Sequence, residues 1–409
     1  MAVPIAIFAA TYLLIAVQRV PYVHLNRPAA ALLGAVAMVA VGGLPLEQAY
    51  RAVDLDVMVF LLGLMILVGY LELGGFFEAA GAWLLRRAGT PARLLLLTMA
   101  GGGALSALFV NDTICLVLTP VLLAALKPLG VRPVPYLVGL AIGANIGSAL
   151  TFVGNPQNML IGVWSGLPFA RFALALLPAV GGAMAIAYGV LRMVYRRELA
   201  GPLPAPVVPG AYPVDRRLVG TALALFALAL VGWVAGGSLP LVAIGAGALM
   251  IALGRRDPAE AFAKVEWSLL VFFAALFVVM RGLEHAGAVA PITRAGTALA
   301  TLGGRVGEAA AMSGAMLLLS NLVSNVPAVI LWREVIPGLP DPAAGWLVLA
   351  MSSTFAGNLL LIGSMANLIV AERAEARGVR IGYWEYARAG VPVALLTIAW
   401  GVLVLALRP

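Results

Sequence analysis

Residues 143–162 read GANIGSALTFVGNPQNMLIG and lie within an apolar segment long enough for a membrane helix. A continuous helix is not expected here, because Pro156 lacks a backbone donor and Gly154 adds freedom just before it. Three amide side chains surround the break: Asn155, Gln157 and Asn158. Unpaired polar groups are costly in hydrocarbon, so irregular backbone persists only against protein or a wet cavity. The stretch predicts the broken helix of a membrane transporter, with a proline kink satisfied by neighbouring helices as the alternative.

The composition indicates a protein that crosses the membrane many times. Of the 409 residues, 63% are hydrophobic and only 11% are charged, whereas a soluble domain carries about 25% charged residues. Residues 2–18 are apolar without a basic leader, so we expect a first span and no cleavable signal peptide. Cys115 is the single cysteine, which excludes an intramolecular disulfide, and we expect it to pack as a small hydrophobic residue.

Apolar runs bounded by charge, glycine and proline predict the order of the segments. Full spans are expected at 2–18, 28–46, 55–72, 170–191, 216–234, 238–254, 266–283 and 389–407. Amphipathic stretches are expected at 74–90 and 285–304. Interrupted segments are expected at 92–126 and 307–336, and broken spans at 134–164 and 345–371. A proline-rich linker at 199–214 divides the chain into a first repeat, 1–198, and a second, 215–409.

The two halves match in sequence at three places, always in the same order. Residues 53–75 align without gaps to residues 265–287. SALFVND (106–112) aligns with SNLVSNV (320–326), which places Asn111 on Asn325. GNPQNMLIG (154–162) aligns with GSMANLIVA (363–371), which places Gly154 on Gly363 and Asn158 on Asn367. Because the second and third matches fall at polar interruptions, they indicate an internal repeat.

Each interrupted segment could form one long span, two spans or a re-entrant hairpin. Two full spans need about 40 residues plus a turn, and residues 92–126 and 307–336 fall short of that. A hairpin instead places its polar tip at membrane depth, where protein covers it. We therefore predict an all-α polytopic membrane protein with two repeats, each of five spans and one hairpin, and with broken helices at the midplane. The odd number of spans makes the second repeat inverted.

The distribution of basic residues predicts the orientation. In this scheme 19 of the 26 lysines and arginines lie on one side and 7 on the other. The richer side is expected to be cytoplasmic. The net charge of +8 is therefore interpreted as a topology signal in short loops, and no nucleic-acid partner is expected. Both termini are then extracytoplasmic in a bacterial inner membrane. The first hairpin enters from the cytoplasm and the second from outside.

The hairpin tips and the broken helices are expected to meet at one site. Helix ends there offer unpaired N–H groups to an anion and unpaired C=O groups to a cation. The predicted solute-binding and ion-binding residues are Asn111, Asp112, Thr113, Gly154, Asn155, Gln157, Asn158, Ser324, Asn325, Asn358, Gly363, Ser364 and Asn367.

Asp112 is the only carboxylate predicted to lie deep in the membrane, which makes it the candidate for ion coupling. It could bind sodium together with Asn111 and Asn325, or take up a proton. The alternative is a hairpin cap bonded to backbone N–H groups. Glu72 and Glu284 fall at span ends, where they could anchor the interface or pair with arginines.

Motifs for enzymatic chemistry are missing from the sequence. It contains no GxxxxGK[ST] stretch for ATP hydrolysis, and two histidines with one cysteine cannot supply a usual zinc cluster. We expect neither enzymatic activity nor a bound cofactor. The expected ligands are a coupling Na⁺ or H⁺ and a small inorganic or organic anion, and the expected assembly is a homodimer in the lipid bilayer.

Three motifs resemble the ion transporter superfamily. They are FVNDTICLVLTP (109–120), GNPQN (154–158) and SNVPAVIL (324–331). That group includes divalent-anion:sodium symporters, arsenite pumps of the ArsB type, NhaD-type sodium/proton antiporters and the melanosomal P protein. ANIGSALTFVGNPQN resembles small bacterial anion permeases of this group. The resemblance covers nearly the whole chain. It implies a scaffold domain and a mobile transport domain that carries both hairpins and moves like an elevator.

The tips depart from the pattern of the dicarboxylate symporters, which carry Ser-Asn-Thr at both hairpins. Here the tips read Val110-Asn111-Asp112 and Ser324-Asn325-Val326. The incomplete triplets argue against a dicarboxylate held by two full motifs, and the aspartate favours proton coupling or a cation site. We predict a secondary active transporter of a small anion or oxyanion. Arsenite efflux or sodium/proton antiport is the alternative. A channel or a non-transporting scaffold fits less well, because the polar residues cluster at one depth.

The orientation can be tested at the linker. In a Cys115→Ala background, a Pro206→Cys variant should react with a membrane-impermeant maleimide only after the cells are permeabilised, because the linker is predicted to be cytoplasmic. Labelling of intact cells from outside would contradict the predicted topology.

Overall fold

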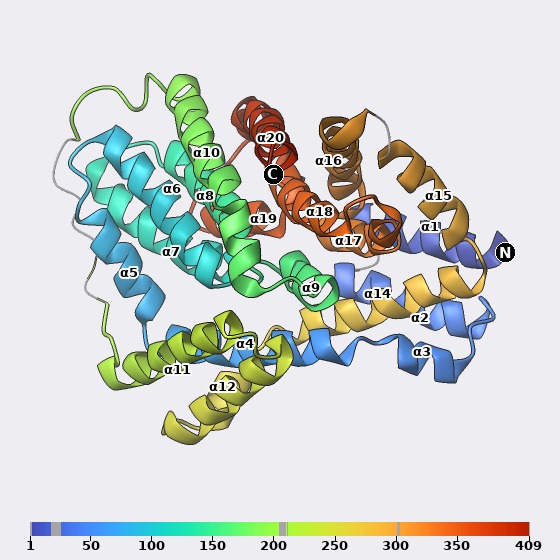
Figure 1. Ribbon diagram of the computed structural model, residues 1–409. Coiled ribbons are helices and arrows are strands. Elements are labelled where there is room, and N and C mark those ends of the chain that lie inside the picture. Colours follow the sequence, from blue (N-terminus) through green and yellow to red (C-terminus); the bar gives the residue numbers. More distant parts are fainter. Residues whose placement is uncertain (1, 18–25, 204–209, 211, 301–302, 409) are drawn as a thin grey trace.

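The computed structural model describes residues 2–17, 26–203, 210, 212–300 and 303–408 (Figure 1). In these residues the protein is helical and forms no strand. Eight of the described helices are long and apolar enough to cross a membrane. The prediction of an all-α polytopic membrane protein is thus confirmed. The middle of the predicted linker, 204–209 together with 211, lies outside the described residues.

Both halves run through the same succession of helices. The first contains α1 (Ala2–Val17), α2 (Arg27–Ala40), α3 (Leu46–Ala52), α4 (Leu55–Leu73), α5 (Phe76–Leu85), α6 (Pro91–Leu108), α7 (Asn111–Leu126), α8 (Val134–Ser148), α9 (Pro156–Ser165) and α10 (Phe169–Val194). The second contains α11 (Arg216–Val234), α12 (Leu239–Leu253), α13 (Pro258–Phe262), α14 (Trp267–His285), α15 (Val289–Ala300), α16 (Gly304–Val323), α17 (Asn325–Arg333), α18 (Pro342–Ala356), α19 (Met365–Glu375) and α20 (Tyr383–Ala406). The element order therefore supports the repeat predicted from sequence.

Most helix boundaries follow from local sequence signals. Asp54, Asp215 and Asp341 cap α4, α11 and α18 by accepting a backbone N–H three residues on. The predicted span 28–46 is wrong at its end, since α2 stops at Ala40 and α3 starts separately at Leu46. The cause is the sequence between them, where Gly43 has a φ of 78° and Pro45 precedes α3.

The helices form two layers, which we name from Figure 1. The lower layer comprises α2–α4 and α11–α14, and the upper layer comprises α5–α10 and α15–α20. The first helix, α1, packs against α2 and α14 of the lower layer and against α16 of the upper layer. In the lower layer α4 packs along α12, while α14 packs along α2. The fourth helix of each half thus packs against the second helix of the other half. Such an exchange of equivalent partners is what a two-fold relation between the halves requires.

The upper layer contains very close helix pairs. Its α6 packs along α8, α16 along α18, and α10 along α20. At the first crossing, a Cβ atom added to Gly147 would lie 2.1 Å from the carbonyl oxygen of Gly103. Only glycine permits this approach, as at the small-residue interfaces common in membranes. The crossing holds the end of α8, where the broken helix starts.

The two predicted hairpins differ in the length of their arms. In the first, α6 and α7 have 18 and 16 residues. In the second, α16 has 20 residues but α17 has only 9. A helix of that length rises about 14 Å, less than half of the hydrocarbon core. The second segment therefore cannot consist of two full spans, whereas re-entry of the first hairpin stays a prediction.

The α6–α8 crossing gives a stability prediction. Gly147→Ala should lower the free energy of unfolding by about 1–3 kcal/mol, because the new methyl group overpacks the contact with Gly103. Gly189→Ala in α10 is the control, since a Cβ there meets nothing within 4 Å. That control should be neutral or stabilising by up to about 1 kcal/mol through helix propensity. Thermal unfolding in detergent measures both variants. Equal melting temperatures would contradict the conclusion that the α6–α8 crossing requires glycine at position 147.

Candidate functional site

A cavity of about 570 Å³ lies between the two layers. Four helices of the upper layer begin at its wall, with Asn111 of α7, Pro156 of α9, Asn325 of α17 and Met365 of α19 among its lining residues. A helix start carries unpaired N–H groups and a partial positive charge. Four such ends around one space favour a ligand that offers oxygen lone pairs or negative charge.

The structure divides the predicted site residues into two groups. Seven line the cavity: Asn111, Asp112, Thr113, Gln157, Ser324, Asn325 and Ser364. Six are not among its lining residues: Gly154, Asn155, Asn158, Asn358, Gly363 and Asn367. The amides of this second group form part of a buried hydrogen-bond network around the helix breaks.

Asn158 and Asn367 play the same structural role in the two halves. The side-chain amide of Asn158 donates to the carbonyl oxygens of Ser148 and Thr151, at 3.3 and 3.1 Å. Asn367 donates in the same way to Gly357 and Leu360, at 2.8 and 3.1 Å. These acceptors occupy equivalent positions in the ungapped repeat. Each asparagine therefore satisfies carbonyl groups that the interrupted helix leaves free.

Asn145 stands at the centre of the network, although it was not among the predicted site residues. Its Oδ1 accepts from Asn111 Nδ2 at 3.1 Å and from Ser364 Oγ at 3.0 Å. Its Nδ2 donates to Oδ1 of both Asn358 and Asn367 at 3.0 Å. One side chain thus joins the first hairpin tip to the second broken helix. The signal available in the sequence was a buried amide 10 residues before Asn155 within an apolar helix.

Thr354 is the counterpart of Asn145 in the second half. Its Oγ1 accepts from Asn155 Nδ2 at 3.3 Å and from Gln157 Nε2 at 3.5 Å. Asn145 of α8 therefore bonds to Ser364 at the start of α19, and Thr354 of α18 bonds to Asn155 at the start of α9. The two breaks are held by reciprocal contacts between the halves.

Gly154 and Gly363 are required for packing at the breaks. The carbonyl oxygen of Gly154 accepts from the backbone N–H of Asn111 at 3.0 Å, which ties the first tip to the first break. A Cβ atom at Gly154 would lie 2.2 Å from Ser148 O, and one at Gly363 would lie 2.6 Å from Asn321 Oδ1. Any larger residue would push these segments apart.

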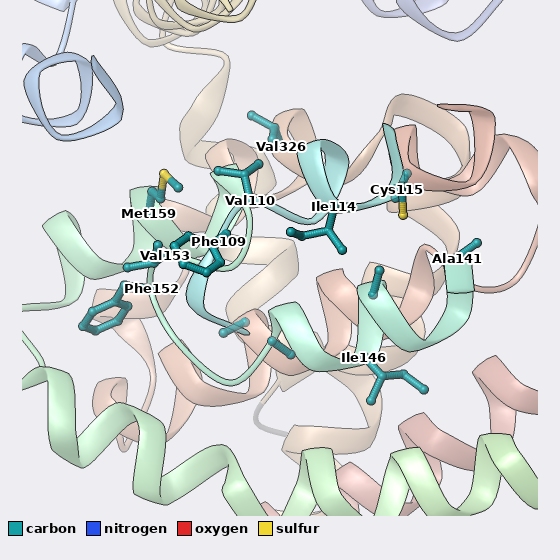
Figure 2. Close-up of a cluster of buried hydrophobic side chains, with 14 of the residues drawn as sticks. Phe109, Val110, Ile114, Cys115, Ala141, Ile146, Phe152, Val153, Met159 and Val326 are labelled. Atoms are coloured by element: carbon teal, nitrogen blue, oxygen red, sulfur yellow. The ribbon is translucent and has the colours of Figure 1, made fainter. Parts of the chain in front are cut away.

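Apolar side chains fix the turn between α6 and α7 (Figure 2). The Phe109 ring packs against Phe77 and Phe226, with centroids 5.3 and 4.9 Å apart. Figure 2 places Val153 of the first break close to Phe109. Cys115 is fully buried, as expected for a small hydrophobic residue. This packing positions Asn111 and Asp112 immediately after the turn.

The second turn is strained. Ser324 has a φ of 81° and a ψ of 157°, a conformation that residues with a side chain rarely adopt. Strain of this kind costs about 1–3 kcal/mol and is concentrated at functional sites. Because Ser324 also lines the cavity, this strained turn belongs to the candidate site.

Charged side chains of both signs face the cavity. They are Arg27, Lys264 and Arg373, with Glu72, Asp112, Glu266 and Glu372. Lys264 Nζ lies 2.6 Å from Glu72 Oε1. Asp112 interacts electrostatically with Arg27 and with Glu266. The cavity therefore contains one more acidic than basic residue.

The two glutamates predicted at span ends pair differently. Glu284 pairs with Arg281 at 3.0 Å, as the arginine-pairing alternative predicted. Glu72 pairs with a lysine instead and faces the cavity. The repeat thus keeps the acidic residue at this position but changes its partner.

Comparison with known proteins identifies the family. The family model described as "Citrate transporter" matches residues 12–356. The chain belongs to the citrate transporter family. This membership confirms the resemblance to the ion transporter superfamily, and it makes the protein a membrane transporter.

Several citrate transporter family relatives match along almost their whole length. A transporter of Mycobacterium bovis is 33% identical, over 99% of this chain and 98% of the relative. The silicon efflux transporter LSI3 of Oryza sativa subsp. japonica is 31% identical, over 97% and 95%. The inner membrane protein YbiR of Escherichia coli is also 31% identical, over 88% and 89%.

A solved structure supports the fold of this family member. The YdaH transporter of Alcanivorax borkumensis, described as having an unusual topology, superposes with a TM-score of 0.58 over 98% of both chains. The sequences are 16% identical, so the likeness concerns the fold alone.

The Asn145 network gives a prediction for this transporter. Asn145→Ala should lower the free energy of unfolding by about 1–3 kcal/mol for each buried group left without a partner. The effect of Asn111→Ala should be smaller in the Asn145→Ala background than alone, because the two residues share a hydrogen bond. Thermal unfolding of both single variants and the double variant measures this coupling. Additive effects would contradict it.

Proposed function

We propose that the protein is a secondary transporter that moves a small anion, an oxyanion or a neutral hydroxide through the cavity between its layers. A neutral hydroxide here means an uncharged, weakly acidic solute with several hydroxyl groups, such as silicic acid. The observation that supports this most is the meeting of four helix starts of the upper layer with amide and hydroxyl side chains at one cavity. Polar groups at membrane depth around broken helices are typical of substrate sites in secondary transporters.

The charges of the cavity favour a solute of low negative charge. Asp112 lies in the first turn of α7 and offsets the positive end of that helix. Glu266 adds a second negative charge nearby. Citrate would bring three negative charges close to these acids, whereas a monovalent oxyanion brings one and a neutral hydroxide brings none. The relative named as a silicon efflux transporter fits this second class, as does arsenite efflux, and both are included in the proposal.

Alternating access would come from movement of one layer past the other. The cavity is lined by α4 and α14 of the lower layer and by both hairpin tips of the upper layer. Displacing the upper layer would carry the tips and the bound solute together, as in an elevator. The side of the cavity that holds Lys264 and Arg373 is the side that the basic-residue distribution predicts to be cytoplasmic. The structure would then correspond to an inward-open state.

Asp112 would couple solute movement to an ion gradient. Asp112 is half-buried, and a carboxylate at membrane depth needs a proton or a cationic partner, because an isolated charge there is very costly. Arg27, a buried residue at the start of α2 in the lower layer, is the electrostatic partner available here. Uptake of a proton or a sodium ion by Asp112 would weaken this attraction between the layers. The ion-loaded and empty carriers would then differ in their freedom to move.

Membrane location and assembly complete the proposal. The Escherichia coli relative is named an inner membrane protein, and we propose the same membrane here with both termini extracytoplasmic. We also propose a homodimer. Neither soluble-enzyme chemistry nor a resident cofactor is part of this function.

The solute class can be tested in proteoliposomes. Uptake and counterflow are measured for silicic acid, arsenite, phosphate, sulfate, succinate and citrate under proton and sodium gradients. Saturable counterflow of a neutral hydroxide or a monovalent oxyanion would support the proposal. Transport of citrate alone would overturn the charge argument, and flux without saturation or counterflow would indicate a channel.

Coupling gives a separate prediction. Asp112→Asn should keep solute exchange but abolish accumulation against a gradient, because the amide mimics the neutral acid and cannot take up a proton. Asp56→Asn, an exposed position at the start of α4, is the matched control and should accumulate solute normally. Proteoliposomes preloaded with solute measure exchange, and imposed pH or sodium gradients measure accumulation. Normal accumulation by Asp112→Asn would contradict the coupling role and favour the alternative, in which Asp112 is a hairpin cap.

A further inference from the structure

A hydrogen bond joins the two layers near the end of α9. Trp164 Nε1 donates to Asp54 Oδ2 at 2.8 Å. The indole ring also packs against Phe277 of α14, with centroids 6.1 Å apart, and lies 4.5 Å below the Arg333 guanidinium. Asp54 itself is fixed, because its other oxygen caps α4 through the N–H of Val57. Trp164 thus seals the upper layer against the lower layer at this point.

The internal repeat gives this contact an equivalent pair. Asp54 precedes α4 as Glu266 precedes α14, and the alignment between these segments has no gaps. Trp164 comes eight residues after the first residue of α9, and Arg373 comes eight residues after the first residue of α19. Glu266 and Arg373 therefore occupy the positions of Asp54 and Trp164 in the other half. Their side chains also suit each other, since a carboxylate and a guanidinium form strong paired hydrogen bonds.

The equivalent pair is apart in this structure. Both Glu266 and Arg373 are exposed and line the cavity, whereas Asp54 and Trp164 are half-buried. In the part of the chain that the structure describes, no ion pair or hydrogen bond joins Glu266 to Arg373. One end of the layer interface is thus closed by Asp54 and Trp164, and the matching end is open.

We propose that Glu266 and Arg373 form the seal that closes the cavity when the carrier faces the other side of the membrane. This inference rests on the alternating access proposed above. In a two-fold arrangement the second state is the first with the roles of the halves exchanged, so the contact between Asp54 and Trp164 opens as the ion pair forms. Because both contacts join the upper layer to the lower one, a displacement that makes one breaks the other.

Cross-linking tests whether the two seals alternate. The single native cysteine allows a Cys115→Ala background that carries either Asp54→Cys with Trp164→Cys or Glu266→Cys with Arg373→Cys. Both pairs are oxidised in proteoliposomes and scored by gel mobility, with and without an ion gradient. We expect any condition that raises one cross-link to lower the other, and either cross-link to arrest transport. The proposal would be overturned if the two cross-link yields varied independently. It would also be overturned if the carrier transported solute and the Glu266–Arg373 cross-link never formed under any condition.

Charge reversal provides a second measurement that avoids cysteines. Glu266→Arg or Arg373→Glu alone should slow transport about tenfold, the effect of losing one charged hydrogen bond from a closed state. The double reversal should restore the rate, and Arg380→Glu, an exposed control outside the cavity, should have no effect. Equal losses in the single and double variants would contradict the pairing. The two cross-link yields are compared without any solute, so failure to find a transported solute would count against the proposed function and leave this comparison intact.

Discussion

Two helices of this protein, α8 and α18, stop inside the upper layer, and their free carbonyl groups must be bonded there. Asn158 and Asn367 supply those bonds from the starts of α9 and α19. Without them each break would bury unpaired carbonyl groups, which hydrocarbon cannot solvate. With them, each helix can end and restart within the protein. The starts of α9 and α19 at the cavity depend on this arrangement.

The network then determines where the polar groups lie relative to one another. Asn145 bonds simultaneously to a hairpin tip, to the loop after α18 and to the start of α19. Hydrogen bonds are strong in such a dry interior, and leaving one partner out is expensive. The buried amides therefore act together as a rigid frame. Asn111, Gln157 and Ser364 belong both to this frame and to the lining of the cavity.

Symmetry and its local loss both have consequences in this fold. The exchange of partners between α4–α12 and α14–α2 gives the two halves equivalent places in the lower layer. The pair of Asp112 and Arg27 breaks the equivalence, because Val326 and Leu239 stand at the matching positions of the other half. Under the alternating access and coupling proposed above, this charge interaction would act in only one of the two states of the carrier, and an ion gradient would then favour one state over the other.

Local chemistry made much of this predictable from the sequence. A proline without a donor cannot continue a helix, and polar interruptions repeated in order indicate a duplicated architecture, so an interruption was expected in each of these segments. The first break nevertheless begins earlier than expected, because α8 ends at Ser148 and Pro156 starts α9. What the sequence could not provide was the choice of partners. Asn145 and Asn358, or Trp164 and Asp54, are joined across more than 100 residues. In a membrane helix that is apolar all round, periodicity does not distinguish the face toward protein from the face toward lipid. Only the packing of the layers determined which amides became framework, which lined the cavity and which contact sealed it.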